Sequence, residues 1–120
     1  MAYVPHSNHP VGAVIVDGKG NIYSGCNVEV AHYKGICAEG TAITQMVLNG
    51  GRKIKDIYVI GPQPEKHLCT PCGDCRQRIR EFADSDTRIH CFGKDGQIDK
   101  TFTMDELLPC SFGPEHLEGL

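Results

Sequence analysis

Three cysteines stand where two helices are predicted to begin, and this arrangement is typical of a metal centre. Cys37 opens the segment Cys37-Ala38-Glu39, while Cys72 and Cys75 lie three residues apart in a second segment. Helix N-termini carry unpaired backbone N–H groups and a partial positive charge, which favour thiolate over thiol. Residues three apart on a helix share a face. If the two N-termini converge across neighbouring strands, Cys37 completes a face of three thiolates.

Such a face could support hydrolytic chemistry. Three protein ligands leave one position of a tetrahedral zinc ion open, and an open position is typical of a catalytic site. Water bound there becomes a nucleophile, because zinc lowers its pKa from about 16 to about 7. Glu39 follows Cys37 by two residues in the first helical turn. A carboxyl group there that does not bind the metal can move protons between water and a substrate.

The cysteine pattern also leaves other interpretations open. A single Cys-x-x-Cys pair can belong to a structural zinc site or a redox site, and residues 69–75 resemble part of an iron–sulfur motif. Ile79 occupies the place of the fourth cysteine of that motif. Pro71 separates Cys69 from the helix, so Cys69 is predicted to be a loop or core thiol. Small hydrophobic roles are predicted for the cysteines in apolar surroundings, which are Cys26, Cys91 and Cys110.

The length of the chain predicts a single domain spanning residues 1–120. The net charge of −3 does not favour binding to nucleic acid or another polyanion. No apolar stretch approaches the roughly 18 residues of a membrane span, and no signal segment opens the chain. Seven cysteines, an odd number without a secretion signal, argue against a disulfide framework. A cytoplasmic protein is therefore predicted.

Alternating strand and helix signals predict an α/β fold that would position the cysteines. Strands are predicted at residues 11–17, 21–26, 54–61, 88–92 and 97–102. Helices are predicted at residues 37–48, 71–83 and 104–108, the second with Thr70 as its N-cap and Pro71 as its first residue. A loop is predicted at residues 62–68. The expected architecture is a three-layer α/β/α sandwich, with helices on both faces of a mixed five-stranded sheet.

With these motifs and elements, the chain resembles the zinc-dependent cytidine deaminases of the small homotetrameric type. Cys37-Ala38-Glu39 together with Pro71-Cys72-x-x-Cys75 is similar to the zinc-binding signature of that family. Further similarity covers nearly the whole chain, in residues 3–8, 10–13, 25–29, 75–77, 106–109 and 111–114.

The resemblance implies zinc held by Cys37, Cys72 and Cys75, with one ion per subunit. It implies that Glu39 protonates N3 of cytosine, accepts a proton from water and delivers one to the departing ammonia. The implied reaction is hydrolytic deamination of cytidine and deoxycytidine to uridine and deoxyuridine, in pyrimidine salvage. The implied partner is a small nucleoside rather than nucleic acid or a membrane.

The resemblance also implies contacts to the substrate. Asn27 and Glu29 would bind the ribose hydroxyls, and the backbone around Ala38 would fix the base edge. Phe112 would cover the base in the site of a neighbouring subunit, so that a homotetramer shares its active sites. His9 stands beside the base where the family usually has phenylalanine.

Departures from the family pattern keep alternatives open. Gly40 follows Glu39 where the family usually has arginine, and the helix that usually precedes Tyr3 is expected to be missing. Gly40 and His9 are compatible with a related deaminase that acts on a modified pyrimidine nucleoside or a nucleoside antibiotic. A polynucleotide substrate is disfavoured by the net charge of −3. A non-catalytic, zinc-stabilised module is the remaining alternative, but it has no need of Glu39.

Overall fold

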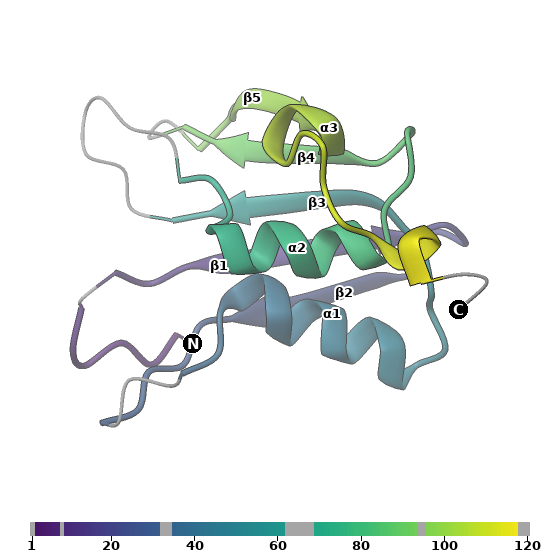
Figure 1. Cartoon of the computed structure of the whole chain (residues 1–120). Coiled ribbons are helices and arrows are strands. Elements are labelled where there is room, and N and C mark those ends of the chain that lie inside the picture. The colour runs from purple at the N-terminus through teal and green to yellow at the C-terminus, as the bar shows by residue number, and fades with distance from the viewer. Residues whose placement is uncertain (1, 8, 32–34, 62–68, 94–95, 118–120) are drawn as a thin grey trace.

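Five strands form one mixed sheet in the computed structural model of the chain, in the order β2-β1-β3-β4-β5 (Figure 1). The structure describes residues 2–7, 9–31, 35–61, 69–93 and 96–117. The strands are β1 (Gly12–Asp17), β2 (Ile22–Cys26), β3 (Ile54–Ile60), β4 (Arg88–Phe92) and β5 (Ile98–Thr103). The helices are α1 (Ala38–Leu48), α2 (Gly73–Glu81) and α3 (Met104–Leu107), followed by a 3-10 turn, η1 (Pro114–Leu117). None of the described helices is long and apolar enough to cross a lipid bilayer.

The direction of the strands places the two long helices on the same face of the sheet. β2 and β3 both run antiparallel to β1 and are therefore parallel to each other, and β3 pairs in parallel with β4. The chain passes from β2 through α1 to β3, then through α2 to β4, advancing in one direction across the sheet. Such crossovers are right-handed, so both helices pack on one side.

This arrangement confirms the mixed five-stranded sheet and the α/β class. It differs from the expectation of helices on both faces, because the described residues place α1, α2 and α3 together on one face (Figure 1). The loop predicted at residues 62–68 lies outside the described part of the chain.

The core lies between the sheet and this helical layer. Alternate residues of β1, β3 and β4 point toward the helices, and their register aligns Ile15, Ile57 and Ile89 in one row. All three are fully buried against α1, α2 and α3. The opposite face carries half-buried side chains, among which the ring of Tyr58 stacks on His90 at 4.6 Å.

The start of α2 differs from the prediction. Cys72 is the N-cap, with an extended backbone at φ −67° and ψ 168°, and the helix begins at Gly73. Thr70 does not cap the helix, because its hydroxyl accepts a hydrogen bond from Nη2 of Arg76 at 3.2 Å. Cys72 therefore has the same position relative to α2, the N-cap, that Cys37 has relative to α1.

Gly25 sets how closely α1 can approach β2. A Cβ atom at this residue would lie 2.6 Å from the carbonyl oxygen of Ala38 and 2.6 Å from the backbone nitrogen of Ala42. Both of these atoms belong to backbone, which cannot rotate away as a side chain can. A residue without a side chain is therefore required where the first turns of α1 cross the strand.

We predict that Gly25→Ala lowers the free energy of unfolding by about 1–3 kcal/mol, because the added methyl group pushes α1 away from β2. Gly12→Ala is the matched control, since a Cβ atom on Gly12 would meet no atom within 4 Å. Urea unfolding of both variants and the unchanged chain measures the difference. Equal unfolding free energies for the two variants would contradict the required close approach.

Candidate metal centre

The N-termini of α1 and α2 lie side by side and bring three sulfur atoms together (Figure 1). The Sγ atoms of Cys37, Cys72 and Cys75 all lie within 4.8 Å of one another. Cys37 and Cys72 are the N-caps of their helices, and Cys75 lies in the first turn of α2. We refer to these three residues as the sulfur cluster. Their convergence, predicted from two helix starts far apart in the sequence, is thus present in the structure.

Neither N-cap cysteine uses its side chain to cap its helix. The first backbone N–H groups of α1 and α2 therefore keep their capacity to donate to the sulfur atoms. The positive ends of both helix dipoles also meet at this point. Both effects favour negative charge on the sulfur cluster.

The cluster nevertheless needs a cation to become fully ionised. Burial raises the pKa of Cys75 far above that of an exposed thiol, and the nearby Glu39 carboxylate raises it further. Burial also raises the pKa of Cys37, and the charge of Cys72 adds to this effect. A divalent ion among the three sulfur atoms would offset their mutual repulsion. Three cysteine ligands in a tetrahedral arrangement suit zinc.

Glu39 lies beside the sulfur cluster and is buried, with only 4% of its surface exposed. Burial raises the pKa of its carboxyl group, while hydrogen bonds from its own backbone N–H and from the Cys75 thiol act in the opposite direction. The side chain comes from the first turn of α1, two residues after the N-cap. This places a carboxyl group screened from bulk water next to the candidate metal position.

Arg76 holds the loop that leads into α2. Its Nε atom donates to the carbonyl oxygen of Pro71 at 2.8 Å, and Nη1 donates to the carbonyl oxygen of Leu107 at 2.8 Å. Together with the bond to Thr70, these contacts join the chain immediately before Cys72 to the end of α3. Arg76 belongs to residues 75–77, which resemble the family, but its partners at Pro71 and Leu107 could not be predicted from the sequence.

The space above Gly40 is occupied by an arginine from the other helix. A Cβ atom on Gly40 would lie 2.7 Å from Nη1 of Arg78 in α2. Arg78 also pairs with Asp74 at 3.2 Å across one turn of the same helix. A guanidinium group therefore lies over the first turn of α1, although the residue after Glu39 is glycine.

Asn27 is positioned by the segment that precedes β1. Its Oδ1 atom accepts a hydrogen bond from the backbone nitrogen of Val11 at 2.9 Å, and its Nδ2 atom donates to the carbonyl oxygen of His9 at 3.0 Å. The structure thereby brings His9, which is exposed, next to Asn27. The contact between the two runs through the backbone of His9 rather than its imidazole ring.

Glu29 binds the same N-terminal segment. Its Oε1 atom accepts from the backbone nitrogens of His6 and Ser7 at 3.0 Å each, and its Oε2 atom accepts from the Ser7 hydroxyl. The Ser7 hydroxyl lowers the pKa of Glu29, burial opposes this effect, and the two backbone donors add to the lowering. A small cavity of about 250 Å³ borders the carboxylate. It is lined by His6, Ser7, Glu29, Val30 and Gly35.

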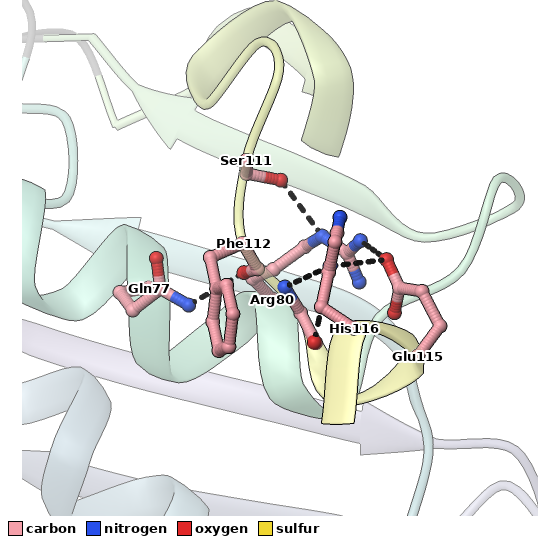
Figure 2. Close-up of polar contacts among 7 residues, drawn as sticks. Gln77, Arg80, Ser111, Phe112, Glu115 and His116 are labelled. Atoms are coloured by element: carbon pink, nitrogen blue, oxygen red, sulfur yellow. Dashed lines mark hydrogen bonds and ion pairs between the residues drawn. The ribbon is translucent and has the colours of Figure 1, made fainter. Parts of the chain in front are cut away.

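The last two predicted substrate contacts lie in different surroundings. Ala38 is fully buried in the first turn of α1, between Cys37 and Glu39. Phe112 is 56% exposed and lies along α2, where its carbonyl oxygen accepts from Nε2 of Gln77 at 2.8 Å (Figure 2). The sulfur cluster is at the N-terminus of the same helix.

The other cysteines lie outside the sulfur cluster. Cys69 packs against the edge of the core and Cys91 is buried within it, as predicted. Cys26 is half-buried. The prediction for Cys110 is wrong, because this residue is exposed and takes a left-handed backbone conformation at φ 52°. The turn that follows Pro109 requires this conformation, and local sequence composition did not indicate it.

Comparison with known proteins identifies one family. The family model for the cytidine and deoxycytidylate deaminase zinc-binding region matches residues 1–91, which include the sulfur cluster and Glu39. A cytidine deaminase of Sporosarcina psychrophila is 39% identical over 118 residues, covering 98% of this chain and 85% of that protein. A cytidine deaminase of Halalkalibacterium halodurans is 36% identical over 118 residues, covering 97% and 86%.

Solved structures agree with this result. The crystal structure of cytidine deaminase from Burkholderia pseudomallei matches with a TM-score of 0.83 and 34% identity, over 92% of this chain and 87% of that chain. That of cytidine deaminase from Mycobacterium tuberculosis matches with a TM-score of 0.77 and 30% identity, over 93% and 85%. The resemblance first drawn from motifs is therefore confirmed.

We predict that Cys72→Ser abolishes tight zinc binding without unfolding α2, because serine removes one sulfur ligand yet is a preferred N-cap residue. Elemental analysis after gel filtration should find about one zinc ion per unchanged chain and almost none in the variant. Cys110→Ser is the matched control, since Cys110 is an exposed cysteine outside the cluster. Retention of zinc by Cys72→Ser, or equal loss from both variants, would contradict the assignment.

Proposed function

The chain belongs to the family of cytidine and deoxycytidylate deaminases, and we propose that it catalyses the zinc-dependent hydrolytic deamination of cytidine and deoxycytidine. Water and substrate are converted to uridine or deoxyuridine and ammonia. The observation that supports this most is the sulfur cluster beside a buried carboxyl group that is not one of the three sulfur donors. Relatives named cytidine deaminase over nearly the whole chain support the same substrate.

Cys37, Cys72 and Cys75 would hold the zinc ion in this proposal. When bound, zinc acts as a Lewis acid that makes water nucleophilic at neutral pH. The three sulfur atoms lie within 4.8 Å of one another, and three protein ligands would leave the fourth position of a tetrahedral ion open for water. Arg76 would maintain this geometry through the loop before Cys72.

Glu39 would carry the protons of the reaction. Deamination requires a proton at N3 of the pyrimidine, addition of a water oxygen at C4 and a proton for the departing amino group. A single carboxyl group can pass the first proton of the water to N3 and then pass the second, from the hydroxyl added at C4, to the departing amino group. Burial of Glu39 beside Cys75 supports this role, because the side chain is held next to the reacting atoms and away from bulk water.

Asn27 and Glu29 would bind the ribose hydroxyls, and the backbone at Ala38 would bind the base edge. An amide and a carboxylate together offer more hydrogen-bonding positions than the described N-terminal segment uses. The cavity beside Glu29 gives a hydroxyl group access to the carboxylate. His9 would border the base, and Phe112 would cover the base of a neighbouring subunit.

We further propose a cytoplasmic homotetramer with shared active sites, which would serve pyrimidine salvage. The ring of Phe112 is exposed, and aromatic residues are enriched in interfaces between proteins, which supports a contact with another subunit. The seven cysteines are free thiols, which is usual in a reducing compartment.

A second candidate substrate is a modified pyrimidine nucleoside or a nucleoside antibiotic. The exposed His9 next to Asn27 favours this candidate, because imidazole can form hydrogen bonds that phenylalanine cannot. A zinc-stabilised module without activity is the alternative outside enzymes. That alternative offers no reason for a buried carboxyl group beside the cluster.

We predict that Glu39→Gln lowers kcat for cytidine by at least about 10²-fold, the lower end of the range for general acid–base catalysis, while zinc content stays unchanged. The amide keeps the shape of the side chain but cannot carry the proton. Glu81→Gln is the control, since it makes the same chemical change at an exposed position of α2. Full turnover by Glu39→Gln would exclude the proposed proton transfer.

A nucleoside panel distinguishes the candidate substrates. We expect ammonia release from cytidine and deoxycytidine with higher kcat/KM than from modified pyrimidine nucleosides or from cytosine within a short oligonucleotide. The oligonucleotide is expected to be poor because the chain carries a net charge of −3. A preference for a modified nucleoside would favour the second candidate, and no turnover of any member by the zinc-loaded protein would favour the non-catalytic module.

A further inference from the structure

The C-terminal turn, residues 110–117, is folded around one arginine of α2 (Figure 2). Nε of Arg80 donates to the hydroxyl of Ser111 at 2.8 Å, and Nη2 pairs with the carboxylate of Glu115. The guanidinium group also covers Gly113 closely, since a Cβ atom there would lie 2.5 Å from Cζ. Arg80 thus contacts the turn at three positions.

The same turn carries the exposed Phe112. One helical turn before Arg80, Gln77 donates to the carbonyl oxygen of Phe112 and so holds its backbone against α2. The ring of His116 stacks on the ring of Phe112 with centroids 5.1 Å apart. His116 is held in turn, because its Nδ1 atom accepts from the backbone nitrogen of Gly113 at 3.0 Å. The backbone and one ring face of Phe112 are therefore fixed, while 56% of the residue stays exposed.

This interaction differs from an ordinary ion pair at the protein surface. Only 18% of the Arg80 side chain is exposed, and its planar group binds two different side chains. Arg78, two residues earlier, is 48% exposed and pairs with an Asp74 side chain that is 68% exposed. Exposed pairs of the second kind contribute little to structure. A planar guanidinium with several fixed partners can define the geometry of a turn.

We propose that Arg80 is a positioning residue for the active site of a second copy of this chain. It holds the C-terminal turn so that the ring of Phe112 is already in place when it meets the neighbour's substrate, which reduces the ordering needed on binding. This inference rests on the proposed function, in which Phe112 covers the base. Because α2 also carries Cys72 and Cys75, one helix would orient zinc ligands in its own subunit and the aromatic cover in the next.

A double-mutant cycle tests this role, using Arg80→Gln, Phe112→Ala and the combined variant. We expect Arg80→Gln to raise KM for cytidine by about two- to tenfold, the effect of misplacing one aromatic contact. The value of kcat and the zinc content should stay close to those of the unchanged protein. In the Phe112→Ala background, Arg80→Gln should raise KM no further. Arg52→Gln is the control, since Arg52 donates to two backbone carbonyl groups just beyond the C-terminal end of α1 and does not contact the C-terminal turn.

The outcomes separate this inference from the proposed function. If Phe112→Ala leaves KM unchanged, the proposed role of Phe112 is wrong and the role of Arg80 is lost with it. A rise in KM for Phe112→Ala but not for Arg80→Gln would show that Arg80 does not act through Phe112. The same conclusion would follow if the rises in KM of the two single variants multiplied in the combined variant. In both cases the proposed function stands. Should Arg80→Gln fail to fold, Glu115→Ala and Ser111→Ala test the same contacts singly, each with a smaller rise in KM expected and no rise in the Phe112→Ala background.

Discussion

The meeting of two helix N-termini is the constraint on which the rest of the site depends. Cysteine side chains are short, so three of them can share one ion only if α1 and α2 begin within a few ångströms of each other on the same face of the sheet. Two right-handed crossovers that advance in the same direction produce this arrangement. The backbone N–H groups at both helix starts then favour negative charge where the sulfur atoms lie, so the topology contributes to the chemistry as well as to the placement.

Two sets of contacts that do not involve the sulfur atoms hold the two helix starts in place. Gly25 lets α1 lie directly on β2, where any side chain would meet helix backbone. Arg76 ties the loop before Cys72 to the end of α3, so that the entry to α2 depends on a segment more than thirty residues later. The two contacts differ in kind, because Gly25 permits close packing of backbone on backbone, whereas Arg76 forms hydrogen bonds from a charged guanidinium group. Both act on the orientation of a helix rather than on a ligand.

The sequence allowed the strands, the helices and the sulfur cluster to be predicted, because apolar periodicity and cysteine spacing are local patterns. Features decided by distant partners could not be predicted in the same way. Thr70 was predicted as an N-cap because of its side chain, but its hydroxyl accepts a hydrogen bond from Arg76, and Cys72 is the N-cap. Asn27 and Glu29 were singled out by the family resemblance, whereas their bonds to residues 6–11 join segments about twenty positions apart. Helices on both faces were expected from the alternation of strand and helix signals, but the handedness of the two successive crossovers places α1 and α2 on one face.

The helix α2 is the element that links these parts. Its N-terminus supplies Cys72 and Cys75, its first turn continues into Arg76, and its outer face holds the C-terminal turn through Gln77 and Arg80. Residues three to five positions apart on one helix keep a fixed angular relation. The orientation of α2 therefore fixes the directions of its two cysteines, of Arg76 and of the segment that carries Phe112. A rotation of α2 would therefore move Cys72, Cys75 and the exposed ring of Phe112 at the same time. In the proposed homotetramer, this one rigid helix would set both the geometry of the zinc ligands within a subunit and the aromatic contact between subunits.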